Sequence, residues 1–502
     1  MPEPFYITTA ISYPNGPPHI GHAYEAIAGD AIARFQRARG REVRFVSGTD
    51  EHGLKMVQTA RAQGRETIDL ADEMSSYFRN MGELLNISYD AFVRTSEPRH
   101  HAASKAIWEA MQASRDLYID RYEGWYSVRD EAFYDESELV SGEGGEKVSP
   151  QGTPVEWTAE ETWFFRLSKY QQPLLDHYAA HPDFIRPESR RNEVLRFVEG
   201  GLKDLSVSRT SFDWGVPVPG SPDHVMYVWV DALTTYMTGV GYPEQDGDFA
   251  RYWPADVHLI GKDIVRFHTV YWPAFLMSAG LPLPKQVFAH GFLLARGEKM
   301  SKSVGNVVDP LELAERFGVD ALRYFFLREV TFGQDGSYSS EAIVNRVNAE
   351  LANSFGNLAQ RTLSMIFKNL GGVLPEHGQA DDDRALLQRV EAACDEVAER
   401  FEQFAFSVGL EAWMSAVFAC NAYVDVQATW ALRKTDPDRM AAVLGTLVTA
   451  VRRLTMAVAP VIPGSADKLL TLIDSGKGGA PIAQPQPLFP RLELPEEAEA
   501  AE

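Results

Sequence analysis

The chain has 502 residues and a formal net charge of −22, from 48 basic and 70 acidic side chains. Its 45% hydrophobic and 24% charged residues are typical of globular proteins and exclude a fibrous or largely disordered chain, and its length suggests about three domains. The two cysteines, Cys394 and Cys420, exclude a disulfide scaffold and a four-cysteine zinc site, and they fit a reducing compartment. Because the chain is acidic, nucleic acid could bind only through a local basic face.

The beginning of the chain has no basic stretch followed by an apolar one, as a signal peptide has. No apolar run reaches the roughly 18 residues that span a bilayer. The most apolar late segment, residues 447–462, is interrupted by Arg452 and Arg453. We therefore expect a cytoplasmic protein that makes no use of a membrane.

The first elements predict an α/β domain. Residues 5–11 and 43–48 are rich in β-formers, and residues 20–39 between them carry apolar side chains near a 3.6-residue period. A strand, a helix and a strand at this spacing form a βαβ unit with a parallel sheet. Strand–helix alternation returns over 225–241 and 258–280. This domain is therefore predicted over residues 1–115 and again over 225–338.

The remaining residues predict a β-rich insertion and a helix bundle. Aromatic and polar residues alternate over 118–134, ahead of a polar turn region, which places an inserted domain at 116–224. After residue 340 the β signals vanish, and an antiparallel bundle is predicted over 339–490. Its helices are expected at 342–369, 384–402, 407–432 and 440–459. The acidic end, residues 491–502, is expected to be disordered.

The first motif with a chemical meaning is Pro18-His19-Ile20-Gly21-His22, at the turn between the first predicted strand and helix. A helix N-terminus offers N–H groups and a positive dipole end to a phosphate. Two histidines at this spacing can face the same anion, and Gly21 lets a ligand approach the backbone. The alternative is that this turn only caps a helix.

The second motif is Lys299-Met300-Ser301-Lys302-Ser303, in a polar loop. Its two lysines can neutralise a polyphosphate, and its hydroxyls can bond phosphate oxygens. The alternative is a solvated surface loop. Each motif follows an α/β element in a way that allows both to line one crevice.

Together, HIGH at 19–22 and KMSKS at 299–303 resemble the paired signatures of class I aminoacyl-tRNA synthetases. The neighbouring segments resemble the methionyl-tRNA synthetases more closely than the leucine, isoleucine, valine or cysteine enzymes; these segments are residues 10–16, 48–53, 227–232 and 260–268. The resemblance implies a Rossmann-type catalytic domain, an inserted connective domain and a helical anticodon-binding domain.

The resemblance also assigns roles to single residues. Asp50 holds the ammonium group of methionine, and the pocket around the thioether consists of Ile11, Tyr13, Trp229, Ala232, Tyr236, Ile264, His268 and Trp272. Aromatic rings suit a soft thioether, although ordinary core packing is the alternative for the tryptophans and Tyr236. The residues assigned to ATP are His19, Gly21, His22, Gly261, Asp263, Lys299 and Lys302.

The implied reaction starts with attack of the methionine carboxylate on the α-phosphorus of Mg-ATP. Methionyl-adenylate and pyrophosphate form, and the terminal adenosine of tRNA(Met) then accepts methionine for translation initiation and elongation. His19 and His22 stabilise the transition state, while Lys299 and Lys302 neutralise the departing pyrophosphate. Such catalysis rests on positioning and electrostatics.

The resemblance leads to three further expectations. Many family members hold zinc in cysteine knuckles of the insertion; residues 116–165 contain no cysteine, which excludes such knuckles, and we expect packing by Trp125, Tyr126 and Phe133 instead. The resemblance assigns the anticodon to Asn357, Arg361 and Trp430, and core packing is the alternative for Trp430. Four basic residues could supply the local positive face that tRNA needs, or they could simply be solvated: Arg433, Lys434, Arg452 and Arg453. The appended dimerising module of longer members is absent, which predicts a monomer.

Three alternatives stay open at this point. A nucleotidylyltransferase shares the HIGH-like turn and the sheet, but it is usually shorter and lacks a long helix bundle. A synthetase-like binding protein without catalysis is the second, although His22 and Lys302 are both present. Another amino-acid specificity is the third. Because a pocket discriminates by only about 1–3 kcal/mol per methylene, homocysteine should be activated weakly.

Overall fold

The structure, a computed structural model, describes residues 2–130, 132–142, 144–295 and 308–494. The chain forms two compact units. The first comprises Met1–Pro18, Gly40–Gly82 and Ser88–His290, and the second comprises His19–Arg39, Glu83–Ile87 and Gly291–Glu502. Each unit thus draws on separate parts of the sequence. The five domain limits given above stay predictions.

A six-stranded parallel sheet organises the first unit, in the order β3-β2-β1-β14-β15-β9. Its strands are β1 (Pro4–Thr9), β2 (Glu42–Thr49), β3 (Ala91–Arg94), β9 (Ile185–Arg186), β14 (Val257–Gly261) and β15 (Val287–His290). The predicted strands at 5–11 and 43–48 are confirmed as β1 and β2. Ligands of open parallel sheets bind beyond the carboxyl ends of the strands, and the segments that follow β1, β2 and β14 carry Ile11, Asp50 and Asp263.

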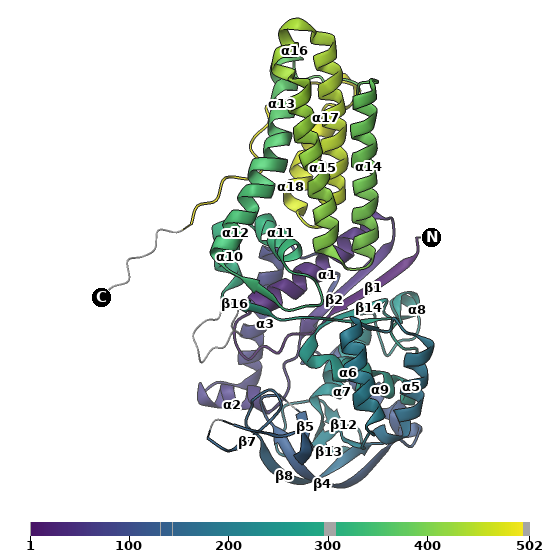
Figure 1. Cartoon of the computed structure of the whole chain (residues 1–502). Coiled ribbons are helices and arrows are strands. Elements are labelled where there is room, and N and C mark those ends of the chain that lie inside the picture. Colours follow the sequence, from purple (N-terminus) through teal and green to yellow (C-terminus); the bar gives the residue numbers. More distant parts are fainter. Residues whose placement is uncertain (1, 131, 143, 296–307, 495–502) are drawn as a thin grey trace, which may run out of the picture. The chain divides into compact units, whose positions relative to one another are not determined.

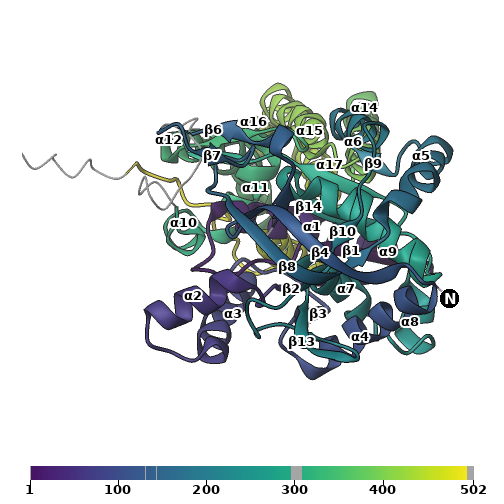
Figure 2. The ribbon, with the colours of Figure 1, turned by 90° about the horizontal axis from the view of Figure 1, so that it is seen from below.

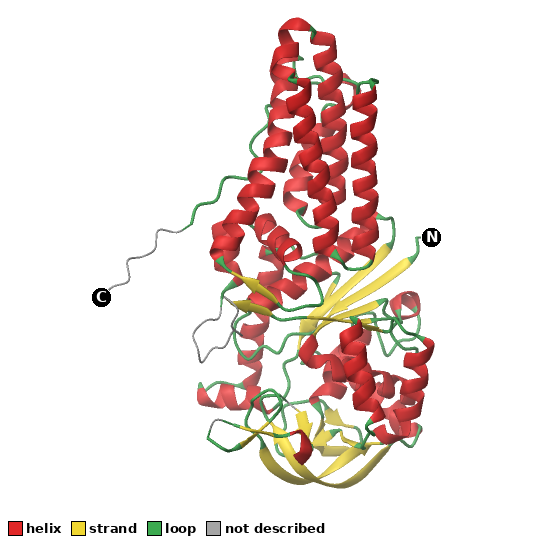
Figure 3. Ribbon diagram, in the orientation of Figure 1, coloured by secondary structure: helices red, strands yellow, loops and turns green. Residues whose placement is uncertain are grey.

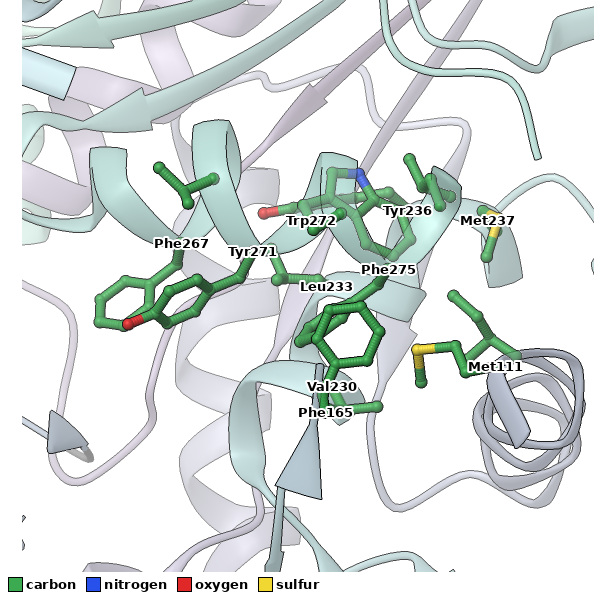
Figure 4. Packing of buried hydrophobic residues seen from close by; sticks show 14 of the residues in the cluster. Met111, Phe165, Val230, Leu233, Tyr236, Met237, Phe267, Tyr271, Trp272 and Phe275 are labelled. Atoms are coloured by element: carbon green, nitrogen blue, oxygen red, sulfur yellow. The ribbon is translucent and has the colours of Figure 1, made fainter. Parts of the chain in front are cut away.

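Helices and aromatic side chains pack around this sheet. The helices are α2 (Leu54–Ala62), α3 (Thr67–Leu84), α4 (Pro98–Ala113), α5 (Gln171–Ala180), α6 (Glu188–Glu199), α7 (Val228–Thr238), α8 (Gly247–Tyr252) and α9 (Trp272–Ala279). Figure 4 shows part of the main core, where Leu233 and Tyr236 of α7 lie with Phe275 of α9 and Met111 of α4, whereas α2 and α3 form a separate apolar cluster. This core holds α7 and α9, which carry four of the predicted methionine residues.

The inserted region is rich in antiparallel strands, as predicted (Figures 2 and 3). One sheet has the order β10-β8-β4-β5, formed by β4 (Leu117–Ser127), β5 (Ala132–Tyr134), β8 (Glu156–Phe165) and β10 (Leu205–Ser206). Smaller ones are formed by β6 (Val140–Ser141) with β7 (Lys147–Val148), and by β11 (Ser208–Arg209), β12 (Pro217–Val218) and β13 (Ser221–Met226). The region also contributes α5, α6 and strand β9 of the parallel sheet.

A buried polar cluster joins two turns of the insertion. The Asp130 carboxylate accepts hydrogen bonds from Ser149 Oγ at 2.7 Å, from Tyr134 Oη at 3.0 Å and from the Thr153 hydroxyl. Ser127 Oγ lies 2.8 Å from Thr153 Oγ1. Trp125 packs edge-on against Trp157 and Tyr126 is buried, while the Phe133 side chain lies outside the described residues. Hydrogen bonds around Asp130 therefore add to the packing predicted for this region.

The second unit combines one early helix with the helical end of the chain (Figure 1). The early helix is α1 (Ile20–Ala38), and β16 (Leu293–Ala295) pairs in parallel with β17 (Gly336–Tyr338). The later helices are α10 (Pro310–Phe317), α11 (Val319–Glu329), α12 (Ser340–Arg346), α13 (Asn357–Asn369), α14 (Asp381–Glu402), α15 (Phe406–Gln427), α16 (Thr429–Thr435), α17 (Pro437–Val458) and α18 (Pro463–Asp474). A π-helical segment, Val347–Gly356, connects α12 to α13.

The bundle confirms the predicted fold class and corrects one helix. Residues 407–432 do not form a single helix, because Ala428 adopts a left-handed conformation (φ 45°, ψ 56°) between α15 and α16. The Thr429 hydroxyl turns toward α13 and donates to Met365 Sδ at 3.2 Å. At the next break, Asp436 caps α17 by accepting from the Arg439 N–H, and Pro437 occupies the first helical position.

Among the described residues, α17 alone is long and apolar enough to cross a membrane by length and composition. The bundle buries 61% of its apolar window, and core helices of globular proteins pass the same criterion.

Candidate active site

The HIGH turn forms the N-terminus of α1 in the second unit. His19 is the N-cap residue, and its Nδ1 accepts a hydrogen bond from the Gly21 N–H at 3.1 Å. His22 Nδ1 accepts from the His19 N–H at 3.1 Å, so the two histidines form a reciprocal capping box. A Cβ at position 21 would lie 2.9 Å from His19 Cε1, so glycine is needed where the ring folds back over the helix.

These hydrogen bonds also determine which ring nitrogen carries the proton. Because both Nδ1 atoms accept from the backbone, each neutral imidazole holds its hydrogen on Nε2. The ring centroids are 3.8 Å apart, so the two histidine rings are in direct contact. Such donors at a helix N-terminus suit phosphate oxygens.

The predicted lysines, Lys299 and Lys302, fall within residues 296–307, outside the described residues. The chain on both sides of that segment lies near α1. Before it, β16 packs against α1, and after it the Val308 carbonyl accepts a hydrogen bond from the Ile20 N–H at 3.2 Å. The connection thus begins and ends beside the helix of the HIGH motif.

The predicted ammonium-binding residue, Asp50, lies directly after β2 in the first unit and is 8% exposed. Its N–H donates to the Ser12 carbonyl at 2.8 Å, and the Ser12 N–H donates to the Gly48 carbonyl at 2.9 Å. These two bonds bring Ile11 and Tyr13, the neighbours of Ser12, to the Asp50 loop. A Cβ on Gly48 would lie 1.9 Å from the Val93 carbonyl oxygen, so only glycine allows β2 and β3 to approach here.

The predicted thioether pocket is held together by a hydrogen-bonded histidine. Tyr236 Oη donates to His268 Nε2 at 2.6 Å, and His268 Nδ1 donates to the Ile264 carbonyl at 2.9 Å. The rings of Trp229 and Trp272 lie 6.0 Å from His268 and 6.4 Å from Tyr236, respectively. Burial lowers the pKa of His268 to about 4, so its ring is neutral at pH 7. An uncharged, largely aromatic lining fits a thioether.

Two further residues, His258 and Phe267, contact predicted pocket residues although the sequence analysis assigned them no role. His258, buried on β14, accepts from the Trp272 indole N–H at 3.2 Å, and its Nδ1 lies 2.7 Å from Thr8 Oγ1. Burial holds the pKa of His258 well below its usual value, so it too is neutral. Phe267 stacks on Trp229 with centroids 3.9 Å apart. Only the spatial pairing with predicted pocket residues identifies these two.

The remaining predicted residues of the first unit are Ala232, buried on α7, and the pair Gly261 and Asp263 after β14. Asp263, which is predicted to bind the ribose, is exposed. A Cβ at Gly261 would lie 2.7 Å from Asp263 Oδ1, so the glycine leaves room for that carboxylate.

The predicted anticodon residues are exposed on the helical bundle. Asn357 and Arg361 lie one turn apart on α13, and Trp430 on α16 is 53% exposed, which argues against core packing for this tryptophan. The Thr429 contact with Met365 joins α16 to α13. Arg452 pairs with Asp474 at 3.2 Å and Arg453 with Glu391 at 3.6 Å, so acidic neighbours offset the charge expected from these two arginines.

Metal-ligating side chains do not gather in the described part of the chain, where no group of three or more histidines, cysteines, aspartates or glutamates could hold an ion. Cys394 and Cys420 are free thiols on α14 and α15. Burial raises their pKa to about 11 and about 12, so neither is a thiolate at pH 7.

Comparisons with known protein families identify the family of this chain. Residues 5–363 match the model for "tRNA synthetases class I (M)", and residues 374–487 match the "Anticodon binding domain of methionyl tRNA ligase". The chain belongs to the methionyl-tRNA synthetases. It is therefore a class I methionine–tRNA ligase, as the two signatures and the neighbouring segments together indicated, and the nucleotidylyltransferase alternative is excluded.

Individual relatives match this synthetase over nearly its whole length. The methionine–tRNA ligase of Brucella suis biovar 1 (strain 1330) is 57% identical, over 97% of this chain and 98% of its own. The Mycobacterium tuberculosis methionyl-tRNA synthetase in complex with methionyl-adenylate is 55% identical with a TM-score of 0.94, covering 97% of this chain and 100% of its own. The free form of the Mycobacterium tuberculosis enzyme has a TM-score of 0.87 at 52% identity, covering 99% of both chains.

Proposed function

We propose that this synthetase activates L-methionine with Mg-ATP and transfers it to the 3′-terminal adenosine of tRNA(Met), for initiation and elongation, as a cytoplasmic monomer without zinc. One observation carries this proposal. The first unit holds both a buried carboxylate, Asp50, and a neutral aromatic pocket around His268. These two features match the two ends of methionine, its ammonium group and its thioether. The methionyl-adenylate bound to the Mycobacterium tuberculosis relative supports the same chemistry.

Each predicted residue has a defined part in the proposed reaction. Asp50 pairs with the ammonium group, while Ile11, Tyr13, Trp229, Ala232, Tyr236, Ile264, His268 and Trp272 surround the side chain. His19 and His22 donate from Nε2 to the phosphates as charge develops, and Gly21 gives their rings space. Asp263 bonds the ribose and Gly261 contacts ATP beside it, while Lys299 and Lys302 neutralise pyrophosphate. Magnesium is brought by ATP. No residue of the chain forms a covalent intermediate.

Amino-acid-dependent ATP–pyrophosphate exchange tests the activation step. We expect exchange with methionine, weak exchange with homocysteine, and none with the other standard amino acids. Asp50→Ala should raise KM for methionine by about 30-fold or more, because loss of a desolvated charge partner costs at least about 2 kcal/mol. KM for ATP should stay close to that of the wild type. Exchange with a different amino acid, or an unchanged KM for methionine in Asp50→Ala, would contradict the pocket assignment.

The anticodon assignment predicts a separate effect. Trp430→Ala should lower kcat/KM for tRNA(Met) aminoacylation by about 5- to 150-fold, since stacking of a base on an aromatic ring contributes about 1–3 kcal/mol. Pyrophosphate exchange without tRNA should not change. Phe418 on α15 is the matched control, because it is a similarly exposed aromatic side chain, at 54%. Equal losses in Phe418→Ala and Trp430→Ala would refute a specific role for Trp430.

A further inference from the structure

Three ionisable side chains without an assigned role meet inside the first unit. Asp231 Oδ2 lies 2.5 Å from His52 Nδ1, and Asp231 Oδ1 lies 2.6 Å from His100 Nε2. The exposed fractions of the three residues are 0%, 3% and 0% for Asp231, His52 and His100. A buried carboxylate bonded to two imidazoles is costly to maintain, because a lost partner leaves an uncompensated charge. The position of this cluster in the fold should therefore indicate what it contributes.

Asp231 is ionised despite its burial. Burial alone would raise the pKa of this carboxyl, but the interactions with His52 and His100 outweigh it and hold the pKa well below its usual value. His100 is fixed in turn, with its Nδ1 2.9 Å from Thr238 Oγ1 and its Nε2 3.1 Å from Ser104 Oγ. The cluster is thus a rigid, hydrogen-bonded junction.

The junction joins the two parts of the proposed methionine site. His52 lies two residues after Asp50, in the loop that follows β2. Asp231 lies on α7 between Trp229 and Ala232, and Tyr236 stands on the same helix. The Asp231–His52 bond therefore connects the loop that binds the ammonium group to the helix that lines the thioether pocket. His100 anchors the opposite carboxylate oxygen to α4.

The loop is held firmly on its other side as well. Glu51, fully buried, accepts from Arg94 Nε at 2.6 Å and from Arg94 Nη2 at 3.1 Å. The Trp214 indole N–H donates to the Glu51 carbonyl at 2.6 Å. Because Glu51 is bonded to Arg94 and Trp214, and His52 to Asp231, the backbone at the preceding residue, Asp50, has little freedom to shift.

We propose that Asp231 is a positioning residue that sets the distance between the Asp50 carboxylate and the thioether pocket, and thereby the length of the amino acid that the site accepts. This inference rests on the proposed roles of Asp50 and Trp229. The spacing between the ammonium group and the sulfur of methionine is limited by its own covalent chain. A displacement of one wall by about 1 Å can cost up to about 100-fold in rate.

Asp231→Asn tests this inference directly. An asparagine amide can accept from one histidine, but its NH₂ group opposes the N–H of the other. In ATP–pyrophosphate exchange, normalised to titrated active sites, KM for methionine should rise by about 10- to 100-fold. KM for ATP should stay close to wild type. The ratio of kcat/KM for methionine to kcat/KM for homocysteine should decrease, and so should the ratio for methionine to the longer ethionine.

Asp116→Asn is the matched control. Asp116, 1% exposed in the same unit, accepts from Lys169 at 2.7 Å, from Tyr170 at 2.6 Å and from Ser278 at 2.7 Å, and it contacts no proposed methionine residue. Both substitutions should lower thermal stability, and only Asp231→Asn should change methionine binding. If both variants lose stability and neither changes KM for methionine, Asp231 is purely structural and the inference is overturned.

A second pair of variants covers the case in which Asp231→Asn does not fold. His52→Ala removes the bond to the loop and leaves Asp231 bound to His100, whereas His100→Ala does the reverse. KM for methionine should rise in His52→Ala and stay near wild type in His100→Ala. Equal rises in both would overturn the inference. Asp50→Ala distinguishes failure of the proposed function from failure of this inference. If Asp50→Ala leaves KM for methionine unchanged, the proposed methionine site is wrong. If Asp50→Ala raises this KM but Asp231→Asn and His52→Ala do not, only the inference about Asp231 is wrong.

Discussion

His22→Ala is expected to slow methionyl-adenylate formation by about 100- to 1,000-fold, the usual loss when one donor to a developing anion is removed. His22 Nδ1 accepts from the His19 N–H, so the ring hydrogen is on Nε2, which is the donor that our proposal assigns to the phosphate oxygens. That bond strengthens as charge develops in the transition state. The change should therefore appear in kcat for pyrophosphate exchange rather than in KM for methionine.

His22→Gln separates the chemistry from the helix cap. A glutamine at this position can accept from the N-cap N–H, as in an ordinary capping box, and it lacks the imidazole. This variant should recover the thermal midpoint lost in His22→Ala and stay as slow in pyrophosphate exchange. Recovery of the rate by glutamine would mean that the turn acts only as a cap. That outcome would favour the alternative in which the HIGH turn only caps α1.

Asp30→Ala is expected to destabilise the second unit by about 3–5 kcal/mol, because it leaves the Arg323 guanidinium buried without its counter-ion. Arg323 and Asp30 are both fully buried, and Arg323 Nη2 donates to Asp30 Oδ2 at 2.6 Å. Burial lowers the pKa of Arg323, whereas the Asp30 charge opposes this change. The guanidinium also donates to the carbonyls of Leu85, Pro460 and Val461, which are distant in sequence. Calorimetry should show the transition of this unit lowered by roughly 6–20 °C.

Arg34→Ala is the control for this prediction. Arg34 Nε binds the same carboxylate at 2.7 Å, but its side chain is 25% exposed, so solvent screens the pair and its loss should cost less than about 1 kcal/mol. Replacing both buried partners, with Asp30→Leu and Arg323→Met, should restore part of the lost stability, because no unpaired charge remains. If Asp30→Ala lowers the free energy of unfolding by no more than Arg34→Ala does, the buried Asp30–Arg323 pair does not contribute more to stability than the partly exposed pair.

Local patterns in the sequence are sufficient for much of this protein. The strand β1, the helix α1 and the strand β2 follow from β-formers and from the 3.6-residue period, which depend on side chains within one or two turns of each other. The HIGH turn needs only neighbouring residues, since His19, Gly21 and His22 satisfy one another at the helix end. The resemblance of contiguous segments likewise indicates the methionine–tRNA ligases from the sequence alone.

Contacts between distant residues required the folded chain. His52 and His100 lie 179 and 131 residues from Asp231, and no periodicity relates such positions. The same holds for His258, which contacts both Thr8 of β1 and Trp272, and for the break at Ala428, next to which Thr429 contacts α13. The exposure of Trp430 likewise depends on how the helices of the bundle pack around α16. Secondary structure and motifs arise from short-range chemistry, whereas the junction at Asp231 and the arrangement of the proposed methionine pocket arise from packing between segments that meet only in the folded chain.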